Sequence, residues 1–337
     1  MRQVWMTKKG GPEVLEVRES PDPTAGPGQV RIRVRAAGLN FAEIMARIGL
    51  YPDAPKAPTV LGYEVSGVVD QVGAGADFVV GARVIALTRF GGHSDTVVVP
   101  ATQVALIPDS LTFEKAAAIP VNYATAWLML IHQGNLKAGE TVLVHAAAGG
   151  VGQAALQICK WKGATVIGTA SPSKHARLRE LGVAHCIDYT SLDFEPEVMR
   201  ITNGKGVDIV LDAVGGKSFA KSYRVLGSLG RLFMFGGSGF VPGAGLNIFA
   251  ILKAFFGMPK FKPFQMMDVN KGVFGINLGH LWDKTTELQS MLREILAKVE
   301  DGTFDPVVDQ VFPFSEAAKA HERIKGRHNF GKVILVP

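Results

Sequence analysis

The chain has 337 residues, 47% of them apolar and 20% charged, which supplies large buried cores and excludes a disordered protein. Thirty-six Lys and Arg against 30 Asp and Glu leave a formal charge of +6, a mild excess that indicates a basic surface or an anionic cofactor rather than a nucleic-acid-binding face. Two cysteines are too few for a disulfide framework or a four-cysteine zinc site.

The N-terminal third of the chain consists of short β-branched runs separated by glycine and proline. Residues 29–35 alternate apolar and polar side chains, the pattern of a strand with one solvent-exposed face. Similar runs follow at 59–72, 83–87 and 96–99. Several short strands at this spacing predict a compact, mostly β domain.

The pattern changes to helix over 113–133, and from Glu140 strands and helices alternate. We predict strands at 141–145, 165–169, 184–187, 207–214 and 231–235, and helices at 151–162, 175–181 and 219–226. Such alternation predicts a parallel, doubly wound sheet. A helix at 284–300 and a strand at 332–336 fall outside this series, and we expect that strand to rejoin the first domain.

The strongest motif is the segment His-Ala-Ala-Ala-Gly-Gly-Val-Gly at 145–152, between a predicted strand and a predicted helix. In the dinucleotide-binding pattern G-x-G-x-x-G, Ala147 takes the first glycine position, followed by Gly149 and Gly152. Gly149 lets backbone N–H groups approach a pyrophosphate, and Gly152 permits close packing of helix on sheet. Because the helix N-terminus also attracts phosphate, the motif predicts dinucleotide binding.

The end of the following strand distinguishes between the two nicotinamide dinucleotides. A site for NAD usually carries an acidic residue there, which bonds the ribose hydroxyls. The stretch 168–175 has no acidic residue and instead offers Lys174 and two serines, Ser171 and Ser173. Such donors suit a 2′-phosphate, so we predict NADP(H).

Several motifs resemble the medium-chain dehydrogenase/reductases, in particular their zinc-free quinone oxidoreductase (zeta-crystallin-like) branch, over essentially the whole chain. The motifs are Gly-Pro-Glu-Val-Leu at 11–15, Gly-Leu-Asn at 38–40, the glycine-rich segment at 147–152, and Phe-Ser-Glu-Ala-Ala at 314–318. Two stretches, 40–51 and 274–281, are more closely similar to the VAT-1-like subgroup.

This resemblance implies an α/β protein of two domains. A GroES-like, mostly β catalytic domain is expected at 1–122, completed by 270–337. A Rossmann domain, with a doubly wound parallel sheet that binds NADPH, is expected at 123–269. Its last part, 241–269, is an extended apolar segment, and in this segment the chain departs from the compact members of the family.

Zinc-dependent members of the family carry G-x-C and G-H-E at their catalytic metal. Here Asn40 stands in place of the cysteine, and Gly62-Tyr63-Glu64 replaces Gly-His-Glu. Because two metal-binding side chains are missing, we expect no metal at this site.

The resemblance also implies roles for individual residues. Asn40 and Tyr51 would be the catalytic residues at the nicotinamide, Asn40 orienting the substrate carbonyl and Tyr51 presenting a hydroxyl. The other cofactor-binding residues would be Thr125, Ala148, Gly149, Gly150, Val151, Ser171, Lys174, Tyr189, Val214, Phe235, Gly236, Phe274, Gly275 and Arg327, of which Lys174, Tyr189 and Arg327 surround the 2′-phosphate. The alternatives are a turn-bonding role for Asn40, a loop anchor for Tyr51 and a surface charge for Arg327.

Together these features predict an NADPH-dependent reductase that transfers hydride to a quinone or enone without zinc. One alternative is a reductase of 2-enoyl thioesters or other activated alkenes. Another is a non-catalytic NADPH-binding protein that acts at a membrane surface or on RNA. The family usually forms homodimers, and we expect the same here.

The apolar segment 246–262 carries three lysines and is open to more than one interpretation. It would serve as a helix over the cleft or the dimer interface, as a lid for a hydrophobic substrate, or as a contact with a membrane surface. Its apolar run is too short to span a bilayer, and residues 1–9 lack the apolar core of a signal peptide. We therefore expect a soluble, cytoplasmic protein.

The cofactor preference is directly testable at Lys174. A charge-assisted hydrogen bond contributes about 1.5–3 kcal/mol, so Lys174→Ala should weaken NADPH binding about ten- to a hundredfold while NADH binding changes little. Titration of both cofactors against the wild type and the variant measures the difference. Equal losses for the two cofactors would refute the assignment of the 2′-phosphate to Lys174.

Overall fold

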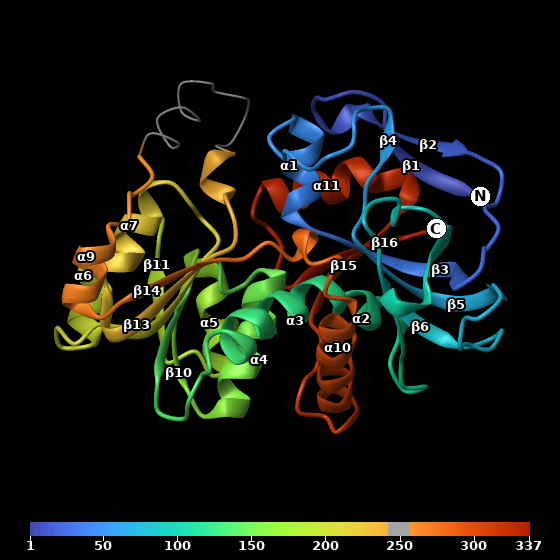
Figure 1. Cartoon of the computed structure of the whole chain (residues 1–337). Coiled ribbons are helices and arrows are strands. Elements are labelled where there is room, and N and C mark those ends of the chain that lie inside the picture. Colours follow the sequence, from blue (N-terminus) through green and yellow to red (C-terminus); the bar gives the residue numbers. More distant parts are fainter. Residues whose placement is uncertain (242–256) are drawn as a thin grey trace. The chain divides into compact units, whose positions relative to one another are not determined.

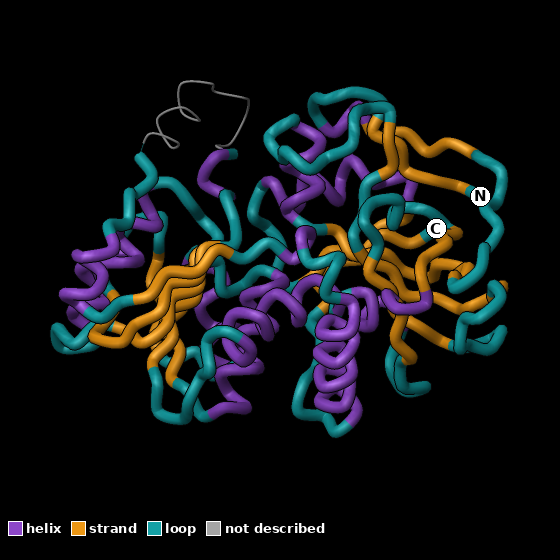
Figure 2. Tube along the Cα trace, viewed as in Figure 1, coloured by secondary structure: helices purple, strands orange, loops and turns teal. Residues whose placement is uncertain are grey.

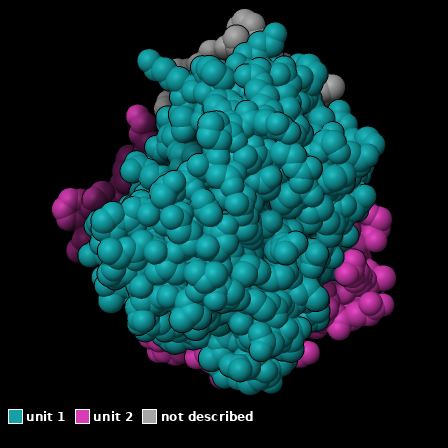
Figure 3. Space-filling view, turned by 90° about the vertical axis from the view of Figure 1, so that its right-hand side faces the viewer, with its two compact units in different colours: residues 1–124, 278–337 teal, residues 125–277 magenta. Residues whose placement is uncertain are grey.

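The computed structural model describes residues 1–241 and 257–337, so most of the apolar segment 246–262 lies outside the described residues. The chain forms two compact units, which are coloured separately in Figure 3. Unit 1 comprises 1–124 and 278–337, and unit 2 comprises 125–277. Within the described ranges, no helix is both long enough and apolar enough to cross a bilayer.

Unit 1 is built on a seven-stranded sheet of order β15-β16-β3-β5-β6-β8, with β7 paired to β3, and a three-stranded sheet of order β2-β1-β4. Its strands are β1 (Arg2–Met6), β2 (Leu15–Glu19), β3 (Gln29–Leu39), β4 (Thr59–Val60), β5 (Glu64–Val72), β6 (Arg83–Leu87), β7 (Thr96–Pro100), β8 (Val104–Leu106), β15 (Val308–Pro313) and β16 (Lys332–Val336). Its helices are α1 (Phe41–Ile48), α2 (Phe113–Ala117), α10 (Thr285–Glu300) and α11 (Ala317–Lys325).

The alternating pattern at the start of β3 produces the expected two-faced strand. Val30, Ile32 and Val34 are buried in the core of unit 1, whereas Arg31 and Arg33 on the other face both bond Asp70. The strand predicted at 332–336 is β16, which runs antiparallel to β3. This pairing confirms that the last strand rejoins the first domain.

Unit 2 is a six-stranded, all-parallel sheet of order β11-β10-β9-β12-β13-β14, as the sequence predicts. Its strands are β9 (Thr141–Val144), β10 (Thr165–Ala170), β11 (His185–Asp188), β12 (Val207–Asp212), β13 (Leu226–Met234) and β14 (Gly272–Gly275). Its helices are α4 (Gly150–Lys162), α5 (His175–Glu180), α6 (Phe194–Ile201), α7 (Lys217–Arg224) and α9 (Pro263–Val269), while α3 (Pro120–Trp127) runs across the boundary with unit 1.

The helices of unit 2 cover both faces of the sheet, α4 and α5 on one side and α6, α7 and α9 on the other (Figures 1 and 2). The strand order therefore reverses between β9 and β12. In open parallel sheets, ligands bind beyond the carboxyl ends of the strands at such a reversal. The topology therefore predicts a ligand site at the loops that follow β9 and β12.

Several elements differ from the expected ones. The helix expected at 113–133 is broken into α2, α3 and a π-helical turn at Leu128–His132, because Pro120 lacks a backbone N–H and begins a new helix. Helix α6 was not expected. The return to the first domain, expected at 270, comes after Asn277, because β14 pairs with β13 as the sixth strand of the unit 2 sheet.

Candidate functional site

The carboxyl ends of the six parallel strands form one edge of the unit 2 sheet, here called the carboxyl edge. Ala170 pairs with Asp188, and Asp212 pairs with Met234, which also pairs with Gly275. The residues predicted to bind the cofactor from unit 2 follow these ends in turn. They are Ala148, Gly149, Gly150 and Val151 after β9, Ser171 and Lys174 after β10, Tyr189 after β11, Val214 after β12, Phe235 and Gly236 after β13, and Phe274 and Gly275 at the end of β14.

The glycine-rich turn (145–149) connects β9 to α4 by a very close approach of backbone to backbone. A Cβ placed on Gly152 would lie 2.5 Å from the carbonyl oxygens of both Ala146 and Ala147, so only glycine fits there. Ala146 has a φ of 52°, in the left-handed region, and its carbonyl accepts a bond from the Gly149 N–H at 2.8 Å. Helix α4 begins at Gly150, so its first N–H groups have no acceptor within the helix and suit an anion.

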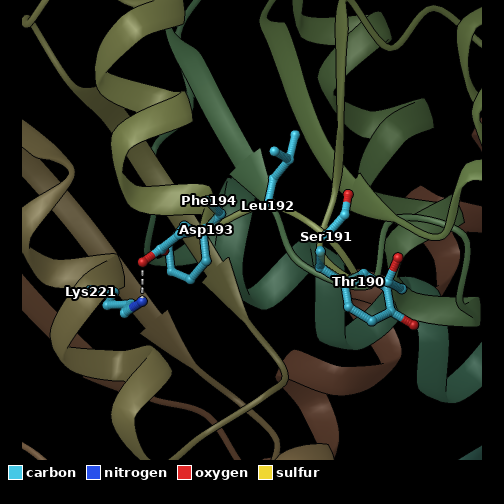
Figure 4. A pocket seen from close by; sticks show the side chains of 7 residues that line it. Thr190, Ser191, Leu192, Asp193, Phe194 and Lys221 are labelled. Atoms are coloured by element: carbon cyan, nitrogen blue, oxygen red, sulfur yellow. Dashed lines mark hydrogen bonds and ion pairs between the residues drawn. The ribbon is translucent and has the colours of Figure 1, made fainter.

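The predicted 2′-phosphate residues of unit 2 lie at the ends of neighbouring strands. Ser171 precedes a short 3-10 turn that contains Lys174, and its hydroxyl lies 3.4 Å from that of Ser173. Tyr189 follows β11 and is 39% exposed. It lines a hollow of about 400 Å³ at the start of α6, across which Asp193 pairs with Lys221 (Figure 4).

The loops after β12 and β13 are bonded to each other. The Phe235 N–H donates to the carbonyl of Asp212 at 3.1 Å, and a Cβ on Gly236 would lie 2.7 Å from the carbonyl oxygen of Ala213. On β14, the ring of Phe274 stacks on Phe233 with a centroid distance of 4.9 Å. These contacts fix the backbone that was predicted to line the nicotinamide side.

Besides Asn40, three predicted site residues lie outside these strand ends. Thr125 is buried within α3, at the first position of unit 2. Tyr51 follows α1 in unit 1, and its ring meets the buried Tyr63 ring edge-on at 6.3 Å. Arg327 is exposed in unit 1 directly after α11, with a φ of 57°.

Asn40 occupies the centre of a buried charged group in unit 1, here called the Asn40 cluster (Asn40, Glu43, Glu64 and Lys332). Its amide oxygen accepts a bond from the Lys332 ammonium at 2.6 Å. Its amide nitrogen donates to Glu64 at 3.0 Å and to Glu43 at 3.4 Å, while its backbone N–H donates to Glu43 at 2.8 Å. Lys332 also forms an ion pair with Glu64, whose second oxygen accepts the Val121 N–H at 2.7 Å.

This arrangement fixes the orientation of the Asn40 amide. Glu43, Glu64 and Lys332 are all at most 2% exposed, and both amide hydrogens of Asn40 are directed at carboxylates. Glu64 enters the sequence interpretation only as the last residue of Gly62-Tyr63-Glu64, and Glu43 and Lys332 have no predicted role. The Asn-x-x-Glu spacing at 40–43, typical of a helix start, was a signal for Glu43, but the role of Lys332 depends on β16 pairing with β3.

At the positions of the zinc-binding motifs, Asn40 and Tyr63 offer an amide and a phenol where those motifs carry Cys and His. The Asn40 amide oxygen faces an ammonium rather than an open coordination position. Burial and the neighbouring Tyr51 hydroxyl raise the pKa of Tyr63 far above its ordinary range. The described residues contain no group of three or more His, Cys, Asp or Glu side chains arranged to hold a metal.

Comparison with known proteins gives consistent matches. Residues 26–109 match the family model described as alcohol dehydrogenase GroES-like domain, and residues 181–335 match that described as zinc-binding dehydrogenase. The human synaptic vesicle membrane protein VAT-1 homolog is 41% identical, covering 100% of this chain and 86% of its own length. A quinone oxidoreductase of Pseudomonas aeruginosa is 36% identical, covering 100% of this chain and 99% of its own length.

Solved structures agree in fold over the whole chain. Escherichia coli quinone oxidoreductase complexed with NADPH has a TM-score of 0.87 at 29% identity and covers 100% of both chains. The CurK enoyl reductase has a TM-score of 0.85 at 29% identity, with coverage of 99% of this chain and 98% of its own. Both structures therefore have the same fold as this chain over nearly its whole length.

The Asn40 cluster predicts a pH dependence of stability. Burial raises the pKa of Glu43 from 4.5 to about 7, despite the opposing charge of Lys332. Between these values the folded protein keeps a proton on Glu43 that the unfolded chain has released, so the contribution of Glu43 to the free energy of unfolding should fall by about 3 kcal/mol as pH rises from 4.5 to 7. Glu43→Gln should remove this contribution, which is measured as the difference between wild type and variant in denaturant unfolding at pH 5 and pH 8.

The exposed Glu294 on α10 provides the control. Glu294→Gln should leave the pH profile of the wild type unchanged. If Glu43→Gln shows the same pH dependence of stability as the wild type, the proton is not held by Glu43.

Proposed function

Because this chain belongs to the quinone oxidoreductase and VAT-1 branch of the medium-chain dehydrogenase/reductases, we propose that it reduces quinones and enones with NADPH and without zinc. The observation that carries the proposal is the complete carboxyl edge of unit 2, where the glycine-rich turn meets the first N–H groups of α4. A tight turn that presents the first N–H groups of a helix at this edge of a parallel sheet is the arrangement that binds the pyrophosphate of a dinucleotide.

NADPH is the cofactor that fits the residues at the end of β10. Ser171, Ser173 and Lys174 offer donors there, and no acidic residue lies between 168 and 175. The similar quinone oxidoreductase of Escherichia coli is complexed with NADPH, which supports the same choice here. When bound, NADPH supplies a hydride from its nicotinamide ring.

The residues of the chain bind the cofactor, orient the acceptor and handle the proton. Both hydrogens of the Asn40 amide are held by Glu43 and Glu64, so we assign Asn40 to shaping the acceptor site. Tyr51 then supplies the hydroxyl that meets the negative charge as it develops on the carbonyl oxygen. A conjugated acceptor is electrophilic enough that positioning and one such donor replace a metal.

Two alternatives retain specific support. The similarity to the CurK enoyl reductase favours activated alkenes as substrates, with Tyr51 as proton donor. The similarity to a protein named for the synaptic vesicle membrane favours an NADPH-binding protein whose role is interaction rather than catalysis. The same experiment separates these possibilities.

The test is NADPH consumption by the purified protein over a panel of quinones, enones and 2-enoyl thioesters. We expect saturable oxidation of NADPH, much faster than that of NADH, with quinones or simple enones as the best acceptors. Tyr51→Phe should lower turnover of enones about a hundredfold, the size of a general-acid contribution, and that of quinones less, because water can protonate the product.

Tyr223→Phe is the matched control, because the Tyr223 hydroxyl has no hydrogen-bonding partner within the described part of the chain. It should leave turnover unchanged. Unchanged enone turnover in Tyr51→Phe would rule out Tyr51 as the donor. Tight NADPH binding without turnover of any acceptor would contradict the reductase proposal and favour the interaction protein.

A second copy of the chain is the partner that we propose for the edge of unit 2. β14 is the last strand of its sheet, and an apolar patch lies beside it. The patch consists of Leu229, Phe264, Met267 and Val269, which are 76%, 80%, 67% and 42% exposed. The Leu229 N–H donates to the Asn270 carbonyl at 2.9 Å, which places the patch next to the start of β14. An exposed patch that continues an unpaired sheet edge fits self-association.

Light scattering during size-exclusion chromatography tests this partner. The wild type should be a dimer, and Phe264→Ser combined with Met267→Ser should be a monomer that still binds NADPH. Leu106→Ser, which removes an apolar side chain 62% exposed in unit 1, should remain dimeric. If the wild type is instead a monomer that sediments with anionic vesicles through these residues, the patch contacts a membrane rather than a second copy of the chain. Lys260 and Lys262 would contribute to such a contact.

A further inference from the structure

A buried carboxylate lies at the end of β12, directly beneath the carboxyl edge. Asp212 is fully buried and receives four hydrogen bonds. One oxygen accepts the N–H groups of Val214 at 2.8 Å and Gly215 at 3.2 Å. The other accepts the hydroxyls of Ser218 at 2.8 Å and Ser222 at 2.7 Å, both from α7.

Among the residues that the structure describes, only one of these two serines continues into a longer chain of hydrogen bonds. Ser222 lies 3.1 Å from Nε2 of His145, and Nδ1 of the same ring lies 3.2 Å from the hydroxyl of Thr169. The Thr169 hydroxyl in turn accepts the backbone N–H of Ala146 at 3.3 Å. The Asp212 chain (Asp212, Ser222, His145 and Thr169) therefore connects β12 with the end of β10 and with the glycine-rich turn.

The hydrogen bonds of the Asp212 chain can run in only one direction. A carboxylate only accepts, so Ser222 donates its hydrogen to Asp212 and must accept one from Nε2–H of His145. The ring is then an acceptor at Nδ1, which takes the hydrogen of Thr169 and leaves a lone pair of that hydroxyl for Ala146. Burial lowers the pKa of His145, against the pull of Asp212, and so keeps the ring neutral.

We infer that Asp212 and His145 are positioning residues that hold two cofactor-contacting segments of backbone in register with each other. One oxygen of Asp212 fixes the Val214 loop directly. The other acts through Ser222, His145 and Thr169 on Ala146, the left-handed residue of the glycine-rich turn. The inference rests on the proposed binding of NADPH at the carboxyl edge.

None of the four side chains is positioned to contact a ligand itself. His145, Thr169, Ser222 and Asp212 are at most 3% exposed, and the ring of Phe194 packs edge-on against His145 at 4.4 Å. Their effect on a cofactor is therefore indirect, through the backbone of Ala146 and Val214. This distinguishes them from Lys174, which would act by direct contact.

The first experiment determines the direction of the hydrogen bonds in the Asp212 chain. It uses ¹⁵N NMR of the full-length protein labelled at histidine, with His145→Gln for assignment. The ring of His145 should show one neutral form, protonated at Nε2 and unprotonated at Nδ1, at neutral pH. An Nδ1–H form or a charged ring would overturn the inference. Because no acceptor substrate is present, failure of the reductase proposal leaves this result unaffected.

The second experiment compares two serines that donate to the same oxygen of Asp212. Ser222→Ala interrupts the chain and should weaken NADPH binding about five- to tenfold, the loss expected for one hydrogen bond, and raise KM for NADPH with little change in kcat. Ser218→Ala removes a hydrogen bond to the same oxygen, but Ser218 is not part of the Asp212 chain. This variant should change the Kd for NADPH less than twofold. Equal losses in both variants, or no loss in Ser222→Ala, would overturn the positioning role.

Thr169 offers a further check that separates positioning from general destabilisation. Thr169→Val removes the acceptor of the Ala146 N–H and should weaken NADPH binding to a similar extent as Ser222→Ala. Thr169→Ser keeps the hydroxyl and should restore wild-type affinity. If Thr169→Ser loses as much affinity as Thr169→Val, packing of the side chain rather than the hydrogen bond controls the turn.

Discussion

The close approach of α4 to the end of β9 is the constraint on which the rest of unit 2 depends. Gly152 has two carbonyl oxygens where any other residue would place a Cβ, so the helix begins directly above the strand. Beside that contact, Ala146 turns sharply, with a positive φ, and the side chain of His145 is buried. An imidazole buried in this way must bond both ring nitrogens, and Thr169 and Ser222 meet that need.

Both units use buried charge to hold a functional segment, but they balance it differently. Asp212 is satisfied by four neutral donors and brings no opposite charge with it. In unit 1, Glu43 and Glu64 share the single ammonium of Lys332, which leaves one negative charge too many unless a carboxyl stays protonated. The second arrangement therefore responds to pH through Glu43.

The sequence was most informative where local pattern and chemistry agree. Alternation along β3, the βα series and the glycine-rich turn predicted the two kinds of sheet and the carboxyl edge. The partners of Asn40 and the Asp212 chain were not predicted, because they depend on strand register and on helix α7, not on spacing along the chain. Asp212 lies in an apolar strand and Ser222 in a short helix, where neither stands out. Likewise, the sequence before β14 has no regular pattern, so the place of β14 in the parallel sheet was not predicted.

The path of the chain through unit 1 has a consequence for the order in which the protein forms. Lys332 bonds Asn40 from 292 residues away, and β16 lies between β3 and β15 within the sheet. Unit 2 is continuous in sequence and can fold while the ribosome is still adding residues, whereas unit 1 must wait for β16. A nascent chain would thus be able to form the proposed dinucleotide site before the Asn40 cluster exists. Under the proposed function, a chain that has not yet reached Lys332 would bind the cofactor without a finished acceptor site.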